Sequence, residues 1–249
     1  MIIWLASYPK SGNTFLRSLL TSYLLTDDGK FDEKKLKEIN QFPNLSLFKN
    51  LGIDTSDDLQ IVKNYVKAQE KINSLDANKI RFIKTHSSLN DINGYKFTDL
   101  KNTLGVIYVV RDPRSVVRSY ANHNQLSLKD ATERLLEFGA TIGGIKGSDF
   151  GSNQIVTHMG SWSSNYNTWK EFKKINSYLL VKYEDLVMDT KNTFLQVLNF
   201  IYKLGNSKLE INNSKLKNTI ETTTFESMQK LEKQKGFTES VVDDNGKKI

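Results

Sequence analysis

Lysine and hydroxyl side chains gather in a short polar loop near the start of the chain, at residues 7–14 (SYPKSGNT). The loop contains Lys10, Ser11 and Thr14, and its Pro, Gly and Asn are typical of turns. A cation, hydroxyl donors and backbone N–H groups together can bind a phosphate. The sequence therefore predicts an anion-binding loop, and an ordinary turn with a solvated Lys10 is the alternative.

The segments on either side of this loop predict a strand and a helix. Residues 2–6 (IIWLA) form a short apolar run typical of a buried parallel strand, and from Thr14 apolar residues recur at helical spacing. A phosphate in the loop would face the N-terminus of the helix, whose dipole favours an anion. The loop differs from the GxxxxGK[ST] pattern of nucleoside-triphosphate loops, because Asn13 rather than Lys precedes Thr14.

A second strand–loop–helix unit contains further anion-binding candidates. The apolar run 104–110 (LGVIYVV) predicts a central parallel strand, which ends at Arg111 and is followed by a helix. Strand C-termini of a parallel sheet line the ligand crevice, so Arg111 can bind a phosphate bidentately while Ser119 donates from the helix. A salt bridge from Arg111 to Asp112 or Glu184 is the alternative.

His86 is the candidate acid–base residue. It follows a predicted strand at residues 79–85 (KIRFIKT), and an imidazole with an ordinary pKa near neutrality can accept a proton from an attacking hydroxyl. A hydrogen-bonded histidine at a strand end is the alternative role. Lys84, two residues earlier and on the same strand face, could assist. With three His and no Cys in the chain, we expect no metal site.

The motif YPKSGNTFLR resembles the 5′-phosphosulfate loop of the cytosolic-type sulfotransferases, usually written YPKSGTTW, with Asn13 and Phe15 in place of the commonest Thr and Trp. These enzymes move a sulfuryl group from 3′-phosphoadenosine 5′-phosphosulfate (PAPS) to an acceptor, without a metal. The resemblance implies that Arg111 and Ser119 bind the 3′-phosphate of PAPS. It also implies that the His of the KTH segment, His86, is the general base.

Further segments resemble the same family. Residues 183–186 (YEDL) imply that Tyr183 contacts the adenine, and residues 223–225 (TTF) resemble the TSF segment that frames it. The family's RKG segment, which grips the 3′-phosphate, is matched by residues 235–236, with Gln234 in place of the Arg. The candidate catalytic residues are His86, Lys10, Lys84 and Ser119. The candidate donor-binding residues are Lys10, Ser11, Gly12, Asn13, Thr14, Phe15, Arg111, Ser119, Tyr183, Thr223, Thr224, Phe225, Lys235 and Gly236.

Strands alternate with helices along the chain, which predicts an α/β fold. We expect one three-layer, P-loop-like domain over residues 1–249, with a central parallel sheet and helices on both faces. The other expected elements are helices at 31–39, 57–75, 127–138, 160–172, 193–204 and 209 to about 234, a strand at 178–182 and irregular chain at 42–55. Residues 139–160 contain six of the 14 glycines and predict a lid or a border of the site.

The composition is that of a soluble globular protein, with 38% hydrophobic and 25% charged residues. No apolar run approaches the ~20 residues that span a bilayer, and the apolar N-terminus lacks a basic leader, so we expect a strand there rather than a signal peptide. The absence of Cys fits a cytoplasmic location. The net charge is +7, but four of the six Arg lie in or beside the two candidate nucleotide-binding stretches, which favours a local anion site over a diffuse basic face.

Two other functions remain open from the sequence. A metal-dependent kinase that uses ATP would need Lys next to Thr14 and an acidic strand end, and a non-catalytic nucleotide or nucleic-acid binder would place basic residues among exposed aromatics. For a sulfotransferase we expect a small-molecule or glycan acceptor, in a pocket built by loops 42–55, 87–97 and 139–158. The sequence predicts neither the identity of the acceptor nor the oligomeric state.

Overall fold

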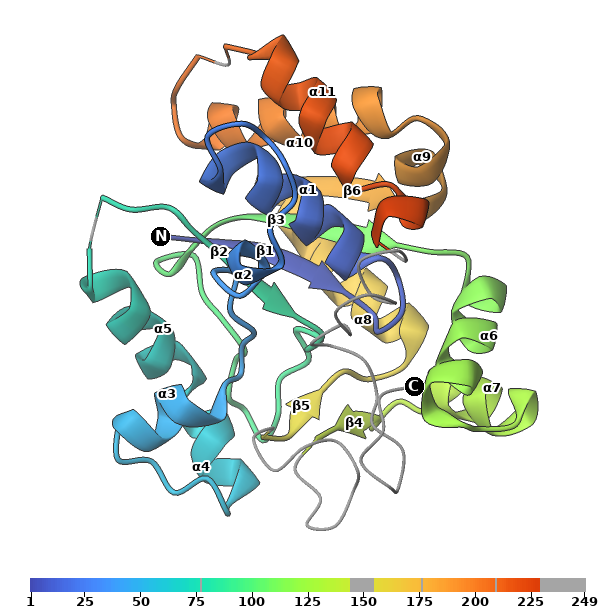
Figure 1. Cartoon of the computed structure of the whole chain (residues 1–249). Helices are drawn as coiled ribbons and strands as arrows, with labels where there is room; N and C mark the ends of the chain where they lie inside the picture. The colour runs from blue at the N-terminus through green and yellow to red at the C-terminus, as the bar shows by residue number, and fades with distance from the viewer. Residues whose placement is uncertain (77, 144–154, 176, 209, 229–249) are drawn as a thin grey trace.

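The computed structural model describes the chain except for residues 77, 144–154, 176, 209 and 229–249. In the described residues, four parallel strands form one sheet in the order β2-β1-β3-β6. The strands are β1 (Ile2–Ser7), β2 (Arg81–Thr85), β3 (Thr103–Val110) and β6 (Tyr178–Lys182). Helices cover both faces, so the predicted three-layer α/β fold is confirmed (Figure 1).

One face of the sheet is covered by α1 (Asn13–Leu25), α10 (Thr190–Leu204) and α11 (Asn213–Thr222) (Figure 1). Successive strand side chains point to opposite faces, so Ile3 and Leu5 pack here against Leu16 and Leu19 of α1. All four side chains are fully buried, and each such burial stabilises the fold by roughly 1.5–3 kcal/mol. This packing fixes the direction in which α1 leaves the loop after β1.

The opposite face carries an aromatic core around Trp4. It is covered by α8 (Trp162–Trp169), the 3₁₀ helix η1 (Lys170–Ile175), α3 (Leu45–Asn50), α4 (Asp58–Lys63) and α5 (Tyr65–Ser74). The expectation of irregular chain at 42–55 was wrong for α3. The expected helix at 57–75 is divided at Asn64, whose side-chain amide donates to the carbonyl of Gln60 at 2.8 Å and so competes with the helical backbone.

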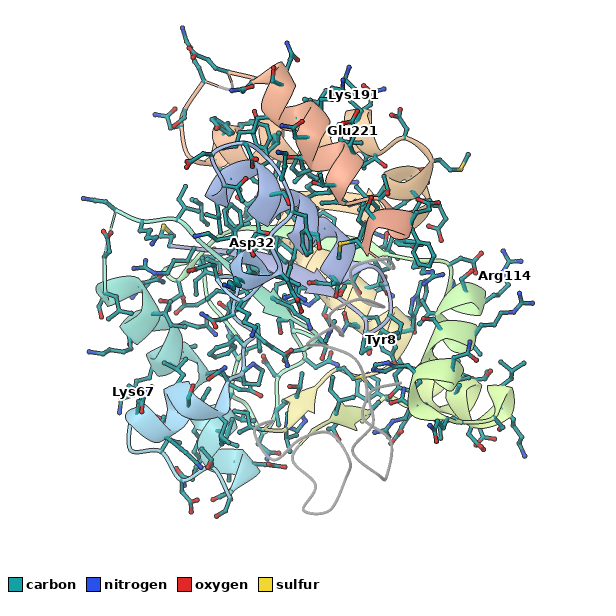
Figure 2. All side chains as sticks on the ribbon, in the orientation of Figure 1. Tyr8, Asp32, Lys67, Arg114, Lys191 and Glu221 are labelled. Carbon is teal, nitrogen blue, oxygen red and sulfur yellow. The ribbon has the colours of Figure 1, made fainter. Side chains whose placement is uncertain are left out.

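A third group of elements lies beyond the C-terminal ends of the strands. It contains α6 (Pro113–Asn124) and α7 (Leu128–Leu136), which pack on each other and on Tyr8 (Figures 1 and 2). The described residues also form two short helices, α2 (Glu33–Leu36) and α9 (Tyr183–Met188). The sequence did not predict the small antiparallel ribbon of β4 (Thr141–Ile142) and β5 (Thr157–His158).

Several predicted elements extend into residues that the structure does not describe. α11 covers only part of the helix predicted from 209 to about 234, and residues 229–234 lie outside the described residues. The same is true of 144–154 in the glycine-rich segment, so the predicted lid stays a prediction. Within the described residues, none of the helices has both the length and the apolar character needed to cross a membrane.

Candidate active site

The loop after β1 has a backbone shape suited to an anion. Lys10 has φ 64° and Gly12 has φ 98°, so the chain enters the left-handed region twice before α1 begins. Gly12, which has no side chain to form a cap, is the N-cap of α1, and the N–H groups of a first helical turn can donate to an anion.

Ser11 gives a second indication that this loop binds a ligand. It is 1% exposed, and its Oγ has no hydrogen-bond partner in the described part of the chain. A buried hydroxyl without a partner costs roughly 1–3 kcal/mol. A phosphate oxygen that accepted from Ser11 would remove that cost, so the residues of the loop fit the group that the sequence assigns to it.

Residues far apart in the sequence meet beside the loop. Arg111, at the end of β3, donates from Nη1 to the carbonyl oxygen of Lys10 at 3.2 Å, and its Cζ lies 4.4 Å from the centre of the Tyr183 ring. A Cβ atom at Gly12 would lie 2.3 Å from Cδ2 of Tyr183. A glycine is therefore required for the ring, which comes from the end of β6, to lie against the loop.

The acidic neighbours of Arg111 have other partners. Asp112 forms an ion pair with Arg114, which points outward from the start of α6 (Figure 2), and that pair lowers the pKa of the Asp112 carboxyl to about 2. Glu184 accepts from the backbone N–H of Asp112 at 2.9 Å. In the described residues no ion pair joins Arg111 to either carboxylate, so the salt bridge considered as an alternative is not formed there.

α6 turns one face toward the lysines of the site. Burial, and then the positive charges of Lys10 and Lys84, lower the pKa of His123 to about 4, so this imidazole is neutral at pH 7. Ser119 lies one turn earlier on the same helix face, although no hydrogen bond joins it to Arg111 in the described residues. The sequence reasoning took His123 as structural or lid-associated, and its spacing of four residues from Ser119 was the one available signal.

The hydrogen bonds of His86 fix its tautomer. Its Nδ1 lies 2.7 Å from the carbonyl oxygen of Ser7 and 3.3 Å from Ser7 Oγ. Because a carbonyl oxygen only accepts, Nδ1 carries a hydrogen, which in a neutral imidazole leaves the lone pair on Nε2. This geometry is compatible with both roles considered above, the general base and the hydrogen-bonded histidine at a strand end.

A buried asparagine that the sequence reasoning missed holds the segment around His86. Asn165 of α8 is 0% exposed and donates to the carbonyls of His86 at 2.9 Å and Met159 at 2.8 Å. Its Oδ1 accepts from the hydroxyl of Tyr108 at 2.7 Å. An asparagine between Trp162 and Trp169, on an otherwise apolar helix face, was the sequence signal that could have revealed it.

The other predicted donor-binding residues of the loop and the first turn of α1 contact the surrounding structure in different ways. Asn13 ties it to β1, donating from Nδ2 to the Leu5 carbonyl at 2.9 Å and to Ser7 Oγ at 3.2 Å. Thr14 Oγ1 accepts from Nη2 of Arg17 at 3.4 Å, and Phe15, in the first turn of α1, is partly buried against the core on this face of the sheet.

Residues 223–225 lie at the end of α11, on the face of the sheet that carries α1 (Figure 1). The hydroxyl of Thr223 bonds within that helix and the hydroxyl of Thr224 bonds to Ser227, while Phe225 is 72% exposed. No hydrogen bond of the described residues links this segment to the loop. Lys235 and Gly236 lie outside the described residues.

Comparison with known proteins connects the whole chain with one family. The profile of the sulfotransferase domain family matches residues 2–248. Luciferin sulfotransferase of Photinus pyralis is 26% identical over 229 residues, which are 91% of this chain and 56% of that protein. Human sulfotransferase 4A1 is 25% identical over 203 residues, 80% of this chain and 59% of that protein. The chain thus spans somewhat more than half the length of these curated relatives.

Solved structures show the same fold at lower identity. Mouse sulfotransferase SULT7A1 complexed with PAP has a TM-score of 0.55 at 19% identity, covering 92% of this chain and 65% of that one. Retinol dehydratase in complex with androsterone and inactive cofactor PAP has a TM-score of 0.53 at 17% identity, covering 98% and 71%. At these identities the likeness shows the fold alone.

Proposed function

Because the chain belongs to the sulfotransferase family, we propose that it transfers a sulfuryl group from PAPS to a hydroxyl or amine of an acceptor. The observation that carries the proposal is the meeting of Lys10, Gly12, Arg111 and Tyr183 at the C-terminal edge of the sheet. The PAP in the related mouse SULT7A1 structure supports the choice of donor, since PAP is PAPS without its sulfuryl group.

In this proposal the donor lies along the strand ends. Lys10, Ser11 and the N-terminus of α1 bind the 5′-phosphosulfate, and the buried Ser11 hydroxyl gains an acceptor. Arg111, assisted by Ser119, binds the 3′-phosphate, for which a planar guanidinium is well suited. Tyr183 contacts the adenine. We also assign residues 223–225, Lys235 and Gly236 to this donor site, on the resemblance alone.

The donor supplies the sulfuryl group, and the protein supplies position, charge and a base. His86 accepts the acceptor proton at Nε2, because its Nδ1–H is held by the Ser7 carbonyl. Lys10 and Lys84 stabilise the negative charge that develops on the leaving phosphate. In-line transfer of this kind depends on orientation and preorganised charge rather than on covalent catalysis, so we propose no metal.

The surroundings of the reaction are also proposals. We expect the acceptor to be a small molecule or a glycan, the whole chain to act as one domain, and the protein to work in the cytoplasm. The metal-dependent kinase and the non-catalytic binder considered above are the alternatives that an experiment must separate.

Ligand-dependent melting separates the three functions. We expect PAP to raise the melting temperature and ATP with Mg²⁺ or a short RNA to leave it unchanged, since a ligand at 100 times its Kd stabilises the native state by about 2.7 kcal/mol. Stabilisation by ATP or RNA without stabilisation by PAP would contradict the proposal. Labelled PAPS with an acceptor panel then measures transfer.

The role of His86 is tested by His86→Ala. This variant should retain PAP-dependent stabilisation, because no donor contact is assigned to His86, and should lose transfer by at least about a hundredfold, the usual contribution of a general base. The retained PAP shift is its internal control for folding. Transfer at the wild-type rate would show that another group accepts the proton.

A further inference from the structure

A basic cavity of about 260 Å³ lies beside the donor loop, between α1, α2 and β2. Its cationic lining residues are Arg17 of α1, Lys37 at the end of α2 and Lys84 of β2, and its amide lining residues are Asn40 and Gln41. None of the described residues that line it is acidic. The chemistry of the cavity is therefore that of an anion site with room for more than a single small oxyanion.

The walls of the cavity are fixed by hydrogen bonds. The backbone N–H of Lys84 donates to the carbonyl of Asn40 at 2.9 Å, and the N–H of Phe42 donates to the carbonyl of Lys84 at 2.9 Å. Residues 40–42 thus run along β2, with Gln41 paired parallel to Lys84. Arg17 is 3% exposed and contacts Thr14 of the donor loop through Nη2. The cavity is therefore lined by Lys84 of β2, and it adjoins the donor loop through the contact of Arg17 with Thr14.

The strand order places this cavity on the acceptor side of the donor loop. Arg111 and Tyr183, assigned to the nucleotide, follow β3 and β6, the loop follows β1, and the cavity adjoins β2. In an in-line transfer the attacking oxygen lies opposite the leaving phosphate, which is the side of β2. Lys84 and His86 are two residues apart, so their Cα atoms are separated by roughly 6.6 Å if β2 continues extended.

We propose, on the basis of the function proposed above, that this cavity binds an anionic group carried by the acceptor, so that small anionic hydroxyl compounds are preferred substrates. A carboxylate, phosphate or sulfate there can accept two hydrogen bonds from Arg17 and a further charge-assisted bond from Lys37. Because the proposed function uses Lys10, Lys84 and Arg111 for the donor, we assign the second anion to Arg17 and Lys37.

Matched acceptor pairs test this inference. 4-Hydroxybenzoate and 4-hydroxybenzamide, and glucuronate and glucose, differ by one negative charge. With saturating PAP present, calorimetric titration should show the acid of at least one pair binding threefold or more tightly than its neutral partner. Lys37→Gln should lower this preference two- to fivefold, as expected for loss of an ion pair made by an exposed lysine. Lys34→Gln is the matched control, because Lys34 is exposed on the same helix and does not line the cavity.

Inorganic sulfate separates an acceptor subsite from a site for free anions. Sulfate should compete with the acids and leave the binding of their neutral partners unchanged. Equal binding within every pair, or a preference that Lys37→Gln leaves unchanged, would overturn the inference. If sulfate binds at Lys37 while no acid is preferred, the cavity takes free anions only and the inference is also wrong. Stabilisation by PAP without a preference for acids contradicts this inference alone, whereas loss of PAP binding contradicts the proposed function.

Discussion

The close approach of Tyr183 to Gly12 predicts a specific effect of Gly12→Ala. The new Cβ would lie 2.3 Å from Cδ2 and 2.9 Å from Cε2 of the ring, and the residue would have to keep φ 98°. Either the loop backbone or the ring must move. The ring also stacks on the Arg111 guanidinium. Movement of the loop or of the ring would therefore separate residues that we assign to donor binding.

The expected magnitude follows from these two contacts. A left-handed backbone costs an L-residue roughly 1–2 kcal/mol, and loss of the cation–π contact between Arg111 and Tyr183 adds about 0.5–1 kcal/mol. For a chain of this size, a loss of about 1.5–3 kcal/mol lowers Tm by about 3–12 °C. We expect PAP affinity to fall at least about tenfold, equivalent to about 1.4 kcal/mol, because the altered loop no longer presents its N–H groups and the ring together.

Thermal melting and calorimetric titration with PAP measure both effects, and Gly94→Ala is the matched control. Gly94 has φ 82°, and a Cβ added there would meet no atom within 4 Å beyond its immediate chain neighbours. Its substitution should therefore cost backbone strain alone and leave PAP affinity at the wild-type value. Wild-type PAP affinity in Gly12→Ala, or an equal loss of affinity in Gly94→Ala, would refute the role assigned to the contact with Tyr183.

Three further predictions concern the residues around the loop. Arg111→Lys keeps the charge but loses the planar stack on Tyr183, so PAP affinity measured by calorimetry should fall about tenfold while Tm changes little; unchanged affinity would contradict the phosphate role. Asn165→Ala leaves buried carbonyls without donors, so urea denaturation should show a loss of about 2–3 kcal/mol; kcat should also fall as His86 loses its support, with PAP affinity retained. His123 has a folded pKa of about 4 against an ordinary value of 6.5, so between these pH values the unfolded chain takes up a proton that the native protein does not, and stability falls as pH is lowered. His123→Gln should remove about 1–2 kcal/mol of that loss at pH 4 after allowance for solvent screening. If the free energy of unfolding, measured by urea denaturation at pH 7 and pH 4, falls equally in both proteins, His123 is not the cause.

The parts of the site that the sequence predicted are those encoded within one short segment. The apolar runs of β1 and β3 are continuous because both faces of the sheet are covered, and the polar residues that follow each run must lie at strand ends. For this reason Lys10 and Arg111 could be placed at one edge of the sheet before any strand order was known.

The parts that the sequence did not predict depend on which elements become neighbours. Asn165 can donate to the buried carbonyls near His86 because α8 packs beside that segment. The local sequence of α8 does not predict which carbonyls will lie within hydrogen-bonding distance. The low pKa of His123 likewise arises from burial and from two lysines on other elements. The break at Asn64 was missed because a side-chain hydrogen bond outweighs weak helical periodicity. The roles of residues 223–225, Lys235 and Gly236 stay predictions.

The order of the strands has a consequence for how the protein acquires its site. The hydrogen bond between Arg111 and Lys10 joins positions 101 residues apart in the chain, and the pairing of β1 with β2 is also between distant segments. Contacts between residues so far apart in the sequence form late, and a fold that depends on them folds slowly. We therefore expect no early intermediate, and no nascent chain that stops before β6, to bind the nucleotide, so PAP would serve as a probe for completion of the native sheet.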